Sequence, residues 1–215
     1  MTQAVSQAPQ LDSNGLRQAL RIAGGCTIGF TISKLMNWPY GIFFTVYPML
    51  LLGLVPVLNK SIVRQFLASA AISIPMVLIM QGLFSHLPVL MTIIVFLAFC
   101  FLFYQMSSGA AFLFGALGVV GLSIQLHFSS YVTGTSSVYP LILSNGLATV
   151  LSIVIAFVMH GVFPDVTARA VRAVPAKAKE SIRHEVLLCA TVATLSFVAF
   201  QVLDLQDSIS AQASS

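Results

Sequence analysis

The sequence predicts an all-α, polytopic transmembrane helical bundle of about seven spans, with its N-terminus in the cytoplasm. Hydrophobic residues make up 58% of the 215 and charged residues only 7%, whereas an ordinary soluble domain carries about 25% charged residues. Neither Asp, Glu, Lys nor Arg occurs from 65 to 164, so this stretch has no charged surface to present to water. At about 20 residues per crossing, it accommodates roughly four spans.

The basic residues indicate the orientation of these spans. If the N-terminus is cytoplasmic, every one of the ten Lys and Arg residues except Lys34 falls on the inner side, as the positive-inside rule requires. The inner residues are Arg17, Arg21, Lys60, Arg64, Arg169, Arg172, Lys177, Lys179 and Arg183. The net charge of +4 therefore reflects membrane orientation, and we expect the lipid bilayer as a partner and no nucleic acid.

Hydropathy and helix-breaking residues divide the chain into successive segments. They predict a polar cytoplasmic tail (1–15), a six-span membrane bundle (16–162), a basic cytoplasmic linker (163–184), a seventh span (185–203) and a polar tail (204–215). The seven spans are expected at 16–36, 40–58, 66–84, 88–106, 110–127, 139–162 and 185–203. The linker forms either a basic amphipathic helix on the inner leaflet or a solvated loop.

Each span ends at a short segment of turn-forming or polar residues. The segments "NKSIVRQ", "SHLP", "SSGA" and "SSYVTGTSSVYP" separate the later spans. The stretch "NWPYG" (37–41) separates the first two spans on the outer side. Pro39 cannot continue a helix, Gly41 is expected to ease the turn, and Trp38 and Tyr40 are typical of an interfacial aromatic belt.

A weak internal repeat links the first span to the seventh. "LRQALRIAGGCTIGFTISKLMNW" and "IRHEVLLCATVATLSFVAFQVLD" both begin with an Arg and continue through an apolar run to a polar end. The seventh span is then either the start of a second repeat, as transporters often contain, or simply another inside-to-outside span.

Small residues and prolines indicate how the spans pack. Glycines at close-packing spacing predict helix–helix contacts: Gly25, Gly29, Gly115 and Gly118. A glycine-lined substrate path is the alternative. The apolar runs also contain three prolines, Pro48, Pro56 and Pro75. Each proline removes a backbone hydrogen-bond donor and predicts a helix kink. Such kinks occur both in moving transporters and in static bundles.

Two cations of the first span are candidates for a substrate path. Arg21 and Lys34 are separated by only about twelve residues, too few to cross a bilayer, and intramembrane cations are functional candidates by default. They lie roughly 140° apart around a helix, so they do not share a face. Each residue either anchors its helix at an interface or attracts an anionic substrate.

Neutral polar residues within the spans complete the candidate path. These are Tyr47, Gln81, Asn145 and His160, which would hydrogen-bond between helices or to a substrate carboxylate. Histidine is the side-chain type that can change its charge near neutral pH, which makes His160 a candidate proton carrier, and an interfacial role is the alternative. Spans one to six contain no Asp or Glu, so a proton would have to come from His160, another polar site or the protonated substrate.

Known enzyme signatures are missing from the sequence. It contains no G-x-S-x-G, H-E-x-x-H or phosphate-loop motif, and its histidines lack the spacing of metal ligands. We therefore expect no enzymatic activity, no catalytic residue, no metal and no cofactor.

The residues from the first span through the proline-bearing second span resemble a known family. The features are an L-R-x-A-L-R entry, a small-residue first span and the W-P-Y-G hairpin. They resemble the bacterial fusaric-acid-resistance and aromatic-acid exporter superfamily, and within it are most similar to inner-membrane proteins of domain of unknown function 2955.

The resemblance implies proton-driven export of small aromatic or other organic acids across the bacterial inner membrane. It also implies a periplasmic adaptor of the membrane-fusion type. Many members carry two multi-span halves, whereas this chain has one half and a further span. A second half-transporter or a homo-oligomer would complete it, and the alternative is a non-transporting structural membrane subunit or a truncated half-transporter.

Overall fold

The computed structural model describes residues 13–55, 57–84, 86–109, 111–130, 138–166 and 179–213. The described part is helical and contains no strand. Its helices are α1 (Ser13–Leu35), α2 (Ile42–Leu54), α3 (Lys60–Phe84), α4 (Pro88–Ser107), α5 (Phe112–Ser130), α6 (Val138–Val162) and α7 (Lys179–Ala213). The expected tail (1–15) and basic linker (163–184) fall largely outside these residues.

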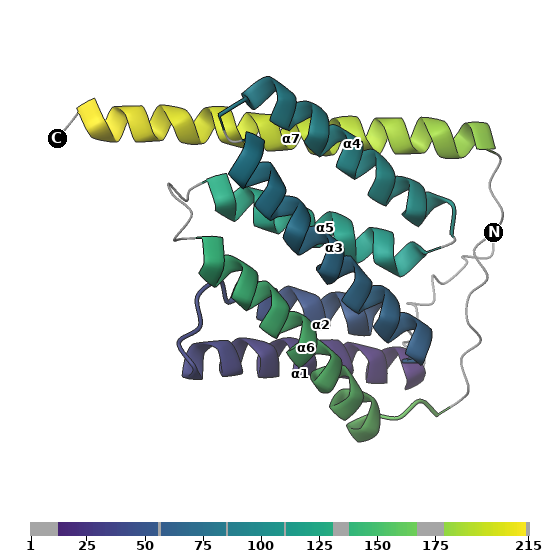
Figure 1. Cartoon of the computed structure of the whole chain (residues 1–215). Coiled ribbons are helices and arrows are strands. Elements are labelled where there is room, and N and C mark those ends of the chain that lie inside the picture. Colours follow the sequence, from purple (N-terminus) through teal and green to yellow (C-terminus); the bar gives the residue numbers. More distant parts are fainter. Residues whose placement is uncertain are drawn as a thin grey trace, which may run out of the picture.

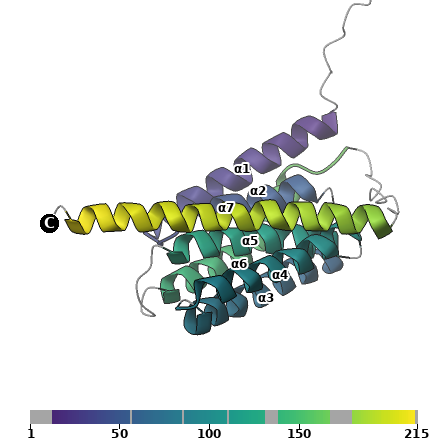
Figure 2. The ribbon, with the colours of Figure 1, turned by 90° about the horizontal axis from the view of Figure 1, so that it is seen from above.

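The helices form one bundle with α1 and α7 at opposite edges (Figure 1). α1 packs on α2 and α6, α7 packs on α4 and α5, and α3 and α5 join the two sides. Seen from above, α1 lies on one face, and α3 and α4 lie on the other (Figure 2). Two apolar cores result, one around α2 and α6 and the other around α4, α5 and α7.

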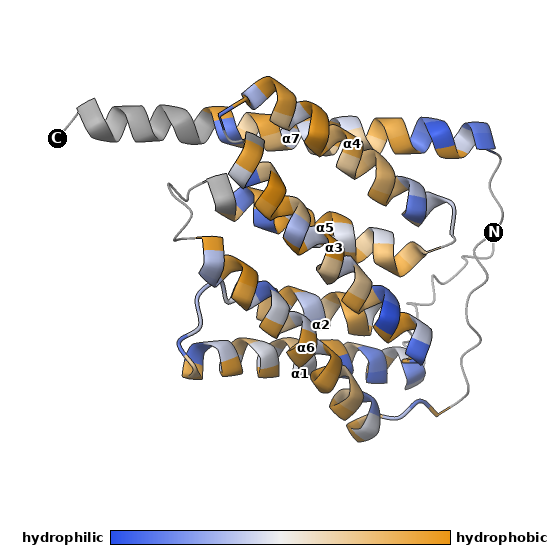
Figure 3. Ribbon diagram, in the orientation of Figure 1, coloured by the Kyte–Doolittle hydropathy of each residue, from blue (hydrophilic) through white to orange (hydrophobic). Residues whose placement is uncertain are grey.

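The two ends of the bundle differ in polarity. α1, α3, α5 and α7 begin at one end, at the right of Figure 1, and hydrophilic residues are concentrated there at the starts of α3 and α7 (Figure 3). We call this end, which carries Arg17, Arg21, Lys60 and Arg64, the basic end. The opposite end, formed in part by residues 36–41, is the turn end.

Four described helices are long and apolar enough to cross a membrane, namely α3, α4, α6 and α7. This makes the chain a multi-pass membrane protein by length and composition. The second span, expected at 40–58, is wrong in extent, because α2 has only 13 residues and measures about 20 Å. It is instead largely buried between its neighbours, with Phe43, Tyr47 and Leu51 at most 3% exposed.

Pro56 explains why α2 is short. α2 ends at Leu54, and Val55 is extended with φ −115° and ψ 107°, the conformation favoured before a proline. Pro56 itself lies outside the described residues, but the helix it was expected to kink has already ended. Pro48 and Pro75, in contrast, lie inside α2 and α3.

Pro48 and Gly29 together explain the close packing of α1 on α2. Pro48 has no N–H to donate to the carbonyl four residues earlier, that of Phe44. This carbonyl oxygen lies against the backbone of Gly29, at the position that a Cβ would occupy. Such an approach allows a Cα–H···O contact, and the absence of a side chain at Gly29 makes it possible.

Two further glycines bring α4 and α5 together in the same way. A Cβ at Gly115 would lie 2.5 Å from the Leu102 carbonyl oxygen, and one at Gly118 would lie 2.6 Å from a Leu102 methyl group. On α1, a Cβ at Gly25 would lie 2.5 Å from Leu52. All four glycines chosen from spacing therefore lie at close helix–helix contacts.

The turn between α1 and α2 differs from the expectation about Gly41. Asn37 and Tyr40 adopt the left-handed conformation, with φ of 48° and 55°, whereas Gly41 has an ordinary φ of −54°. Space around Gly41 is limited, because a Cβ there would lie 3.1 Å from the Ser33 hydroxyl oxygen.

Aromatic contacts fix this turn to the bundle. Trp38 stacks on Phe44 at 4.9 Å between ring centroids, and Tyr40 contacts Phe128 of α5 edge-on at 5.2 Å. The Ser144 hydroxyl of α6 donates to the Pro39 carbonyl at 2.9 Å. The turn therefore contacts three helices, α2 through Trp38, α5 through Tyr40 and α6 through Pro39.

Gly29→Ala tests the contact between α1 and α2. The new methyl group would collide with a backbone oxygen, which cannot move aside as a side chain can, so we expect a loss of about 1–3 kcal/mol in unfolding free energy. The matched control is Gly146→Ala, where a Cβ meets nothing within 4 Å. Thermal unfolding of the detergent-solubilised chain measures both, and equal midpoints would contradict the packing described.

Candidate functional site

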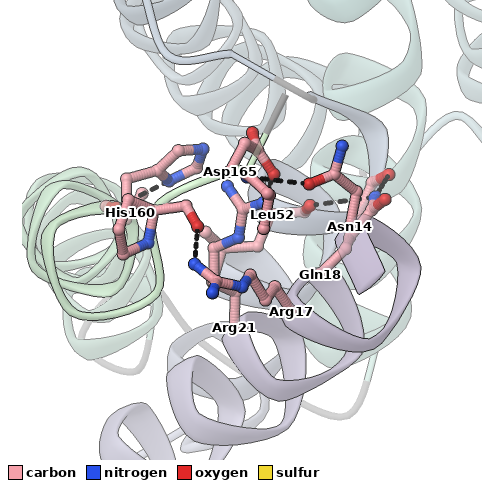
Figure 4. Close-up of polar contacts among 11 residues, drawn as sticks. Asn14, Arg17, Gln18, Arg21, Leu52, His160 and Asp165 are labelled. Carbon is pink, nitrogen blue, oxygen red and sulfur yellow. Dashed lines mark hydrogen bonds and ion pairs between the residues drawn. The ribbon is translucent and has the colours of Figure 1, made fainter. Parts of the chain in front are cut away.

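A buried ion pair lies at the basic end of the bundle. Arg21 of α1 is 2% exposed, and its guanidinium donates to the Asp165 carboxylate beyond the end of α6. Figure 4 shows Arg17, Arg21 and Asn14 on the side of α1 that faces this segment. Arg17 donates to the Pro164 carbonyl, and the Asn14 side-chain oxygen accepts from the Val166 N–H at 2.9 Å.

The spacing of these residues along α1 accounts for the arrangement. Arg17 and Gln18 each lie three or four residues from both Asn14 and Arg21, which places the four side chains on one helix face. Gln18 donates to the Gly53 carbonyl of α2 at 3.0 Å, one of the last carbonyls of a helix, which lack a helical donor. This face of α1 therefore ties together the ends of α2 and α6.

The ion pair changes what Arg21 can do for a substrate. Its charge is paired with a carboxylate, so it offers an incoming anion little net positive potential. The Arg21 Nε is buried and has no hydrogen-bond partner. Sequence reasoning proposed anchoring or substrate attraction for Arg21, and the structure adds a link between α1 and the segment after α6.

A second polar cluster lies in the interior of the bundle. The Tyr47 hydroxyl of α2 donates to the Asn145 side-chain oxygen of α6 at 2.7 Å. The Gln125 amide of α5 donates to the Ser73 hydroxyl of α3 at 3.3 Å. A Cβ on Gly121 would lie 2.9 Å from the Tyr47 oxygen, so this glycine makes room where the two pairs meet.

This interior cluster retains unused hydrogen-bonding capacity. The Asn145 amide nitrogen and the Gln125 amide oxygen are buried without a partner. A buried polar atom without a partner lowers the free energy of unfolding by about 1–3 kcal/mol, and such atoms are rare in native structures. The four side chains of the cluster come from four helices, α2, α3, α5 and α6.

A cavity of about 160 Å³ lies between α4, α5 and α7. Its walls are mainly apolar and include three phenylalanines, Phe99, Phe197 and Phe200. Its polar edge consists of Ser123, Ser196 and His127, and the His127 ring lies 5.3 Å from Phe200, edge-on.

The serine hydroxyls of the cavity are already used as donors. Ser123 donates to the Val119 carbonyl at 2.7 Å, and Ser196 donates to the Val192 carbonyl at 2.9 Å. Their oxygen lone pairs remain as acceptors. The cavity thus combines an aromatic body with hydrogen-bond acceptors at its edge.

The remaining candidates lie apart from this cavity. Lys34 is exposed at the turn end, with its Nζ 5.6 Å from the Phe30 ring centroid. Gln81 lies near the same end in α3, partly buried. His160 lies near the basic end of α6 (Figure 4), where its Nδ1 is 2.9 Å from the Ala156 carbonyl and its Nε2 is buried without a partner.

The six residues of the predicted path therefore do not form one site. Tyr47 and Asn145 are bonded together, Arg21 and His160 lie toward the basic end, and Lys34 and Gln81 toward the turn end. Sequence reasoning overlooked Asp165, the partner of Arg21, and the aromatic cavity. The Phe197 and Phe200 spacing on α7 was the available signal, but any core-facing stripe looks the same.

A double-mutant cycle tests the ion pair. Arg21→Met or Asp165→Leu alone leaves its partner without a counter-charge, and we expect each to lower the unfolding free energy by about 3 kcal/mol. Arg21→Met with Asp165→Leu removes both charges and should recover most of that loss. Denaturant unfolding of the purified chain provides the free energies, and additive losses would contradict direct pairing.

Comparison with known proteins identifies the family of this chain. No curated protein and no solved structure matches the chain. One family model matches, over residues 18–159, a range that includes α1 to α6 almost completely and the interior polar cluster. The chain belongs to the family described as Protein of unknown function (DUF2955).

Proposed function

We propose that this chain is a membrane component of an export system for small organic acids, with monocyclic aromatic acids as the substrate class. The observation that carries the proposal is the aromatic cavity between α4, α5 and α7. A cavity of about 150 Å³ accommodates a benzene molecule, and this one measures about 160 Å³. Phenylalanine rings favour an aromatic guest through stacked and edge-on contacts.

The polar edge of the cavity favours the protonated form of such an acid. A carboxylic acid O–H would donate to Ser123 or Ser196, whose oxygens retain acceptor capacity. A carboxylate has no proton to donate, and its charge would be costly to bury in a mostly apolar site. The substrate would then carry its own proton, consistent with the absence of carboxylates from 65 to 164.

The setting of this function is part of the proposal. We propose that the chain lies in a bacterial inner membrane with the basic end in the cytoplasm and the turn end in the periplasm, an orientation that the positive-inside rule supports. A periplasmic membrane-fusion adaptor, and a second half-transporter or another copy of this chain, are the partners that the resemblance implies. The proposal includes no enzymatic reaction and no cofactor.

One observation favours a second function, that of a non-transporting structural subunit. Arg21 and Tyr47, both candidates for the path, are engaged with Asp165 and Asn145 inside the bundle. Such pairing stabilises a static assembly as well as a transporter. This alternative predicts that loss of the chain lowers the abundance of neighbouring membrane proteins without changing acid accumulation.

Ala193→Leu tests the export proposal by filling the cavity. Ala193 lines the cavity, so a leucine side chain there would crowd a bound guest. We expect the free energy of substrate binding to become about 1–3 kcal/mol less favourable, which corresponds to roughly 5- to 150-fold weaker binding. We expect efflux of labelled benzoate from cells expressing the chain with its partners to fall accordingly. The matched control is Ala199→Leu, an exposed alanine of the same helix.

The outcomes distinguish the two functions. Slower efflux with Ala193→Leu alone, at constant membrane abundance, supports export. Efflux that is equal in both variants and in cells lacking the chain contradicts it. If deletion of the chain instead depletes its neighbours while benzoate accumulation is unchanged, the structural alternative is favoured.

A further inference from the structure

An open groove of about 870 Å³ lies at the basic end, where the start of α3 approaches the last turns of α6. Its polar end is formed by Asn59, Lys60 and Arg64. Among the described residues, no carboxylate lies within ion-pair distance of either cation. The groove thus offers two positive charges that the described part of the protein does not neutralise.

We propose that this groove binds an anionic phospholipid of the leaflet at the basic end. The phosphate headgroup would lie against Lys60 and Arg64, and an acyl chain would follow the groove toward the middle of the membrane. The site is separate from the aromatic cavity, and the inference does not depend on the proposed function.

The start of α3 adds to the attraction for a phosphate. The Asn59 side-chain oxygen accepts from the Ile62 N–H at 2.9 Å, which makes Asn59 the cap of a 25-residue helix. The N-terminus of a helix carries a partial positive charge and exposes backbone N–H groups, so it favours anions. Two cations and a helix N-terminus therefore coincide.

The apolar part of the groove continues from the cations along one face of α3. Arg64, Leu67, Ala68 and Ala71 follow at helical spacing, and the small alanines leave a depression beside Phe157 of α6. From Arg64 to Ala71 the groove extends about 10 Å into the membrane. Its polarity changes in the same direction as that of a lipid, from charged at the surface to apolar at depth.

The size of the groove favours a lipid over a small aromatic acid. It measures about 870 Å³, against about 160 Å³ for the aromatic cavity, and Phe157 at its edge is 57% exposed. A monocyclic acid would leave most of this length uncovered. Basic pockets between transmembrane helices commonly bind anionic headgroups.

Lipid titration of the full chain in detergent micelles, followed by native mass spectrometry, tests the site. The probes are phosphatidylglycerol and phosphatidylcholine with identical acyl chains. Lys60→Gln with Arg64→Gln should weaken phosphatidylglycerol binding roughly tenfold to thirtyfold, the effect of losing two cations near an anionic lipid. The matched control is Lys179→Gln with Arg183→Gln, two exposed cations at the same spacing on α7.

Several results would overturn the assignment. These are equal affinity of the unaltered chain for both lipids, equal weakening by the two double variants, and displacement of phosphatidylglycerol by benzoate. Ala68→Leu keeps both cations but narrows the groove, so it should weaken binding of phosphatidylglycerol even if the neutral double variant fails to fold. Undiminished binding to a folded Ala68→Leu chain would also contradict the proposal.

Discussion

A polar group in the hydrocarbon core of a membrane has no water to bond, so it has to find its partner within the protein. The contact of α1 with α2 shows how this constraint shapes the bundle. Pro48 frees the Phe44 carbonyl oxygen, and Gly29 lets the backbone of α1 approach it. α2, which is too short to cross a membrane and lacks one backbone hydrogen bond at Pro48, is thereby packed inside the protein.

The same constraint explains where the polar side chains lie. Tyr47, Ser73, Gln125 and Asn145 come from four different helices and turn toward one another in the interior. At the basic end, Arg21 reaches Asp165 across the junction of α1 and α6. Many of the exposed side chains on α3, α4, α6 and α7 are, in contrast, large and apolar. Polar contacts therefore link the helices, and the Asn145 amide nitrogen and the Gln125 amide oxygen remain buried without a hydrogen-bond partner.

Composition and charge distribution were sufficient to predict the fold class, because a charge-free stretch as long as 65–164 excludes a soluble surface. Glycine spacing correctly located the close contacts at Gly25, Gly29, Gly115 and Gly118. The extent of α2 was missed, because hydropathy alone does not separate a span from a short buried helix. The pairing of Arg21 with Asp165 was also missed, since the two residues are 144 positions apart. The aromatic cavity depends on how α4, α5 and α7 pack, which no single helix pattern specifies.

We infer that the bundle crosses the membrane with its basic and turn ends on opposite sides. Labelling of single cysteines tests it most directly, in a chain whose three native cysteines are replaced by alanine. Cysteines would be placed at the exposed positions Asn37 and Val166. In intact cells, a membrane-impermeant maleimide should label Asn37→Cys at once and Val166→Cys only after permeabilisation. Labelling of both positions from the same side would contradict the account.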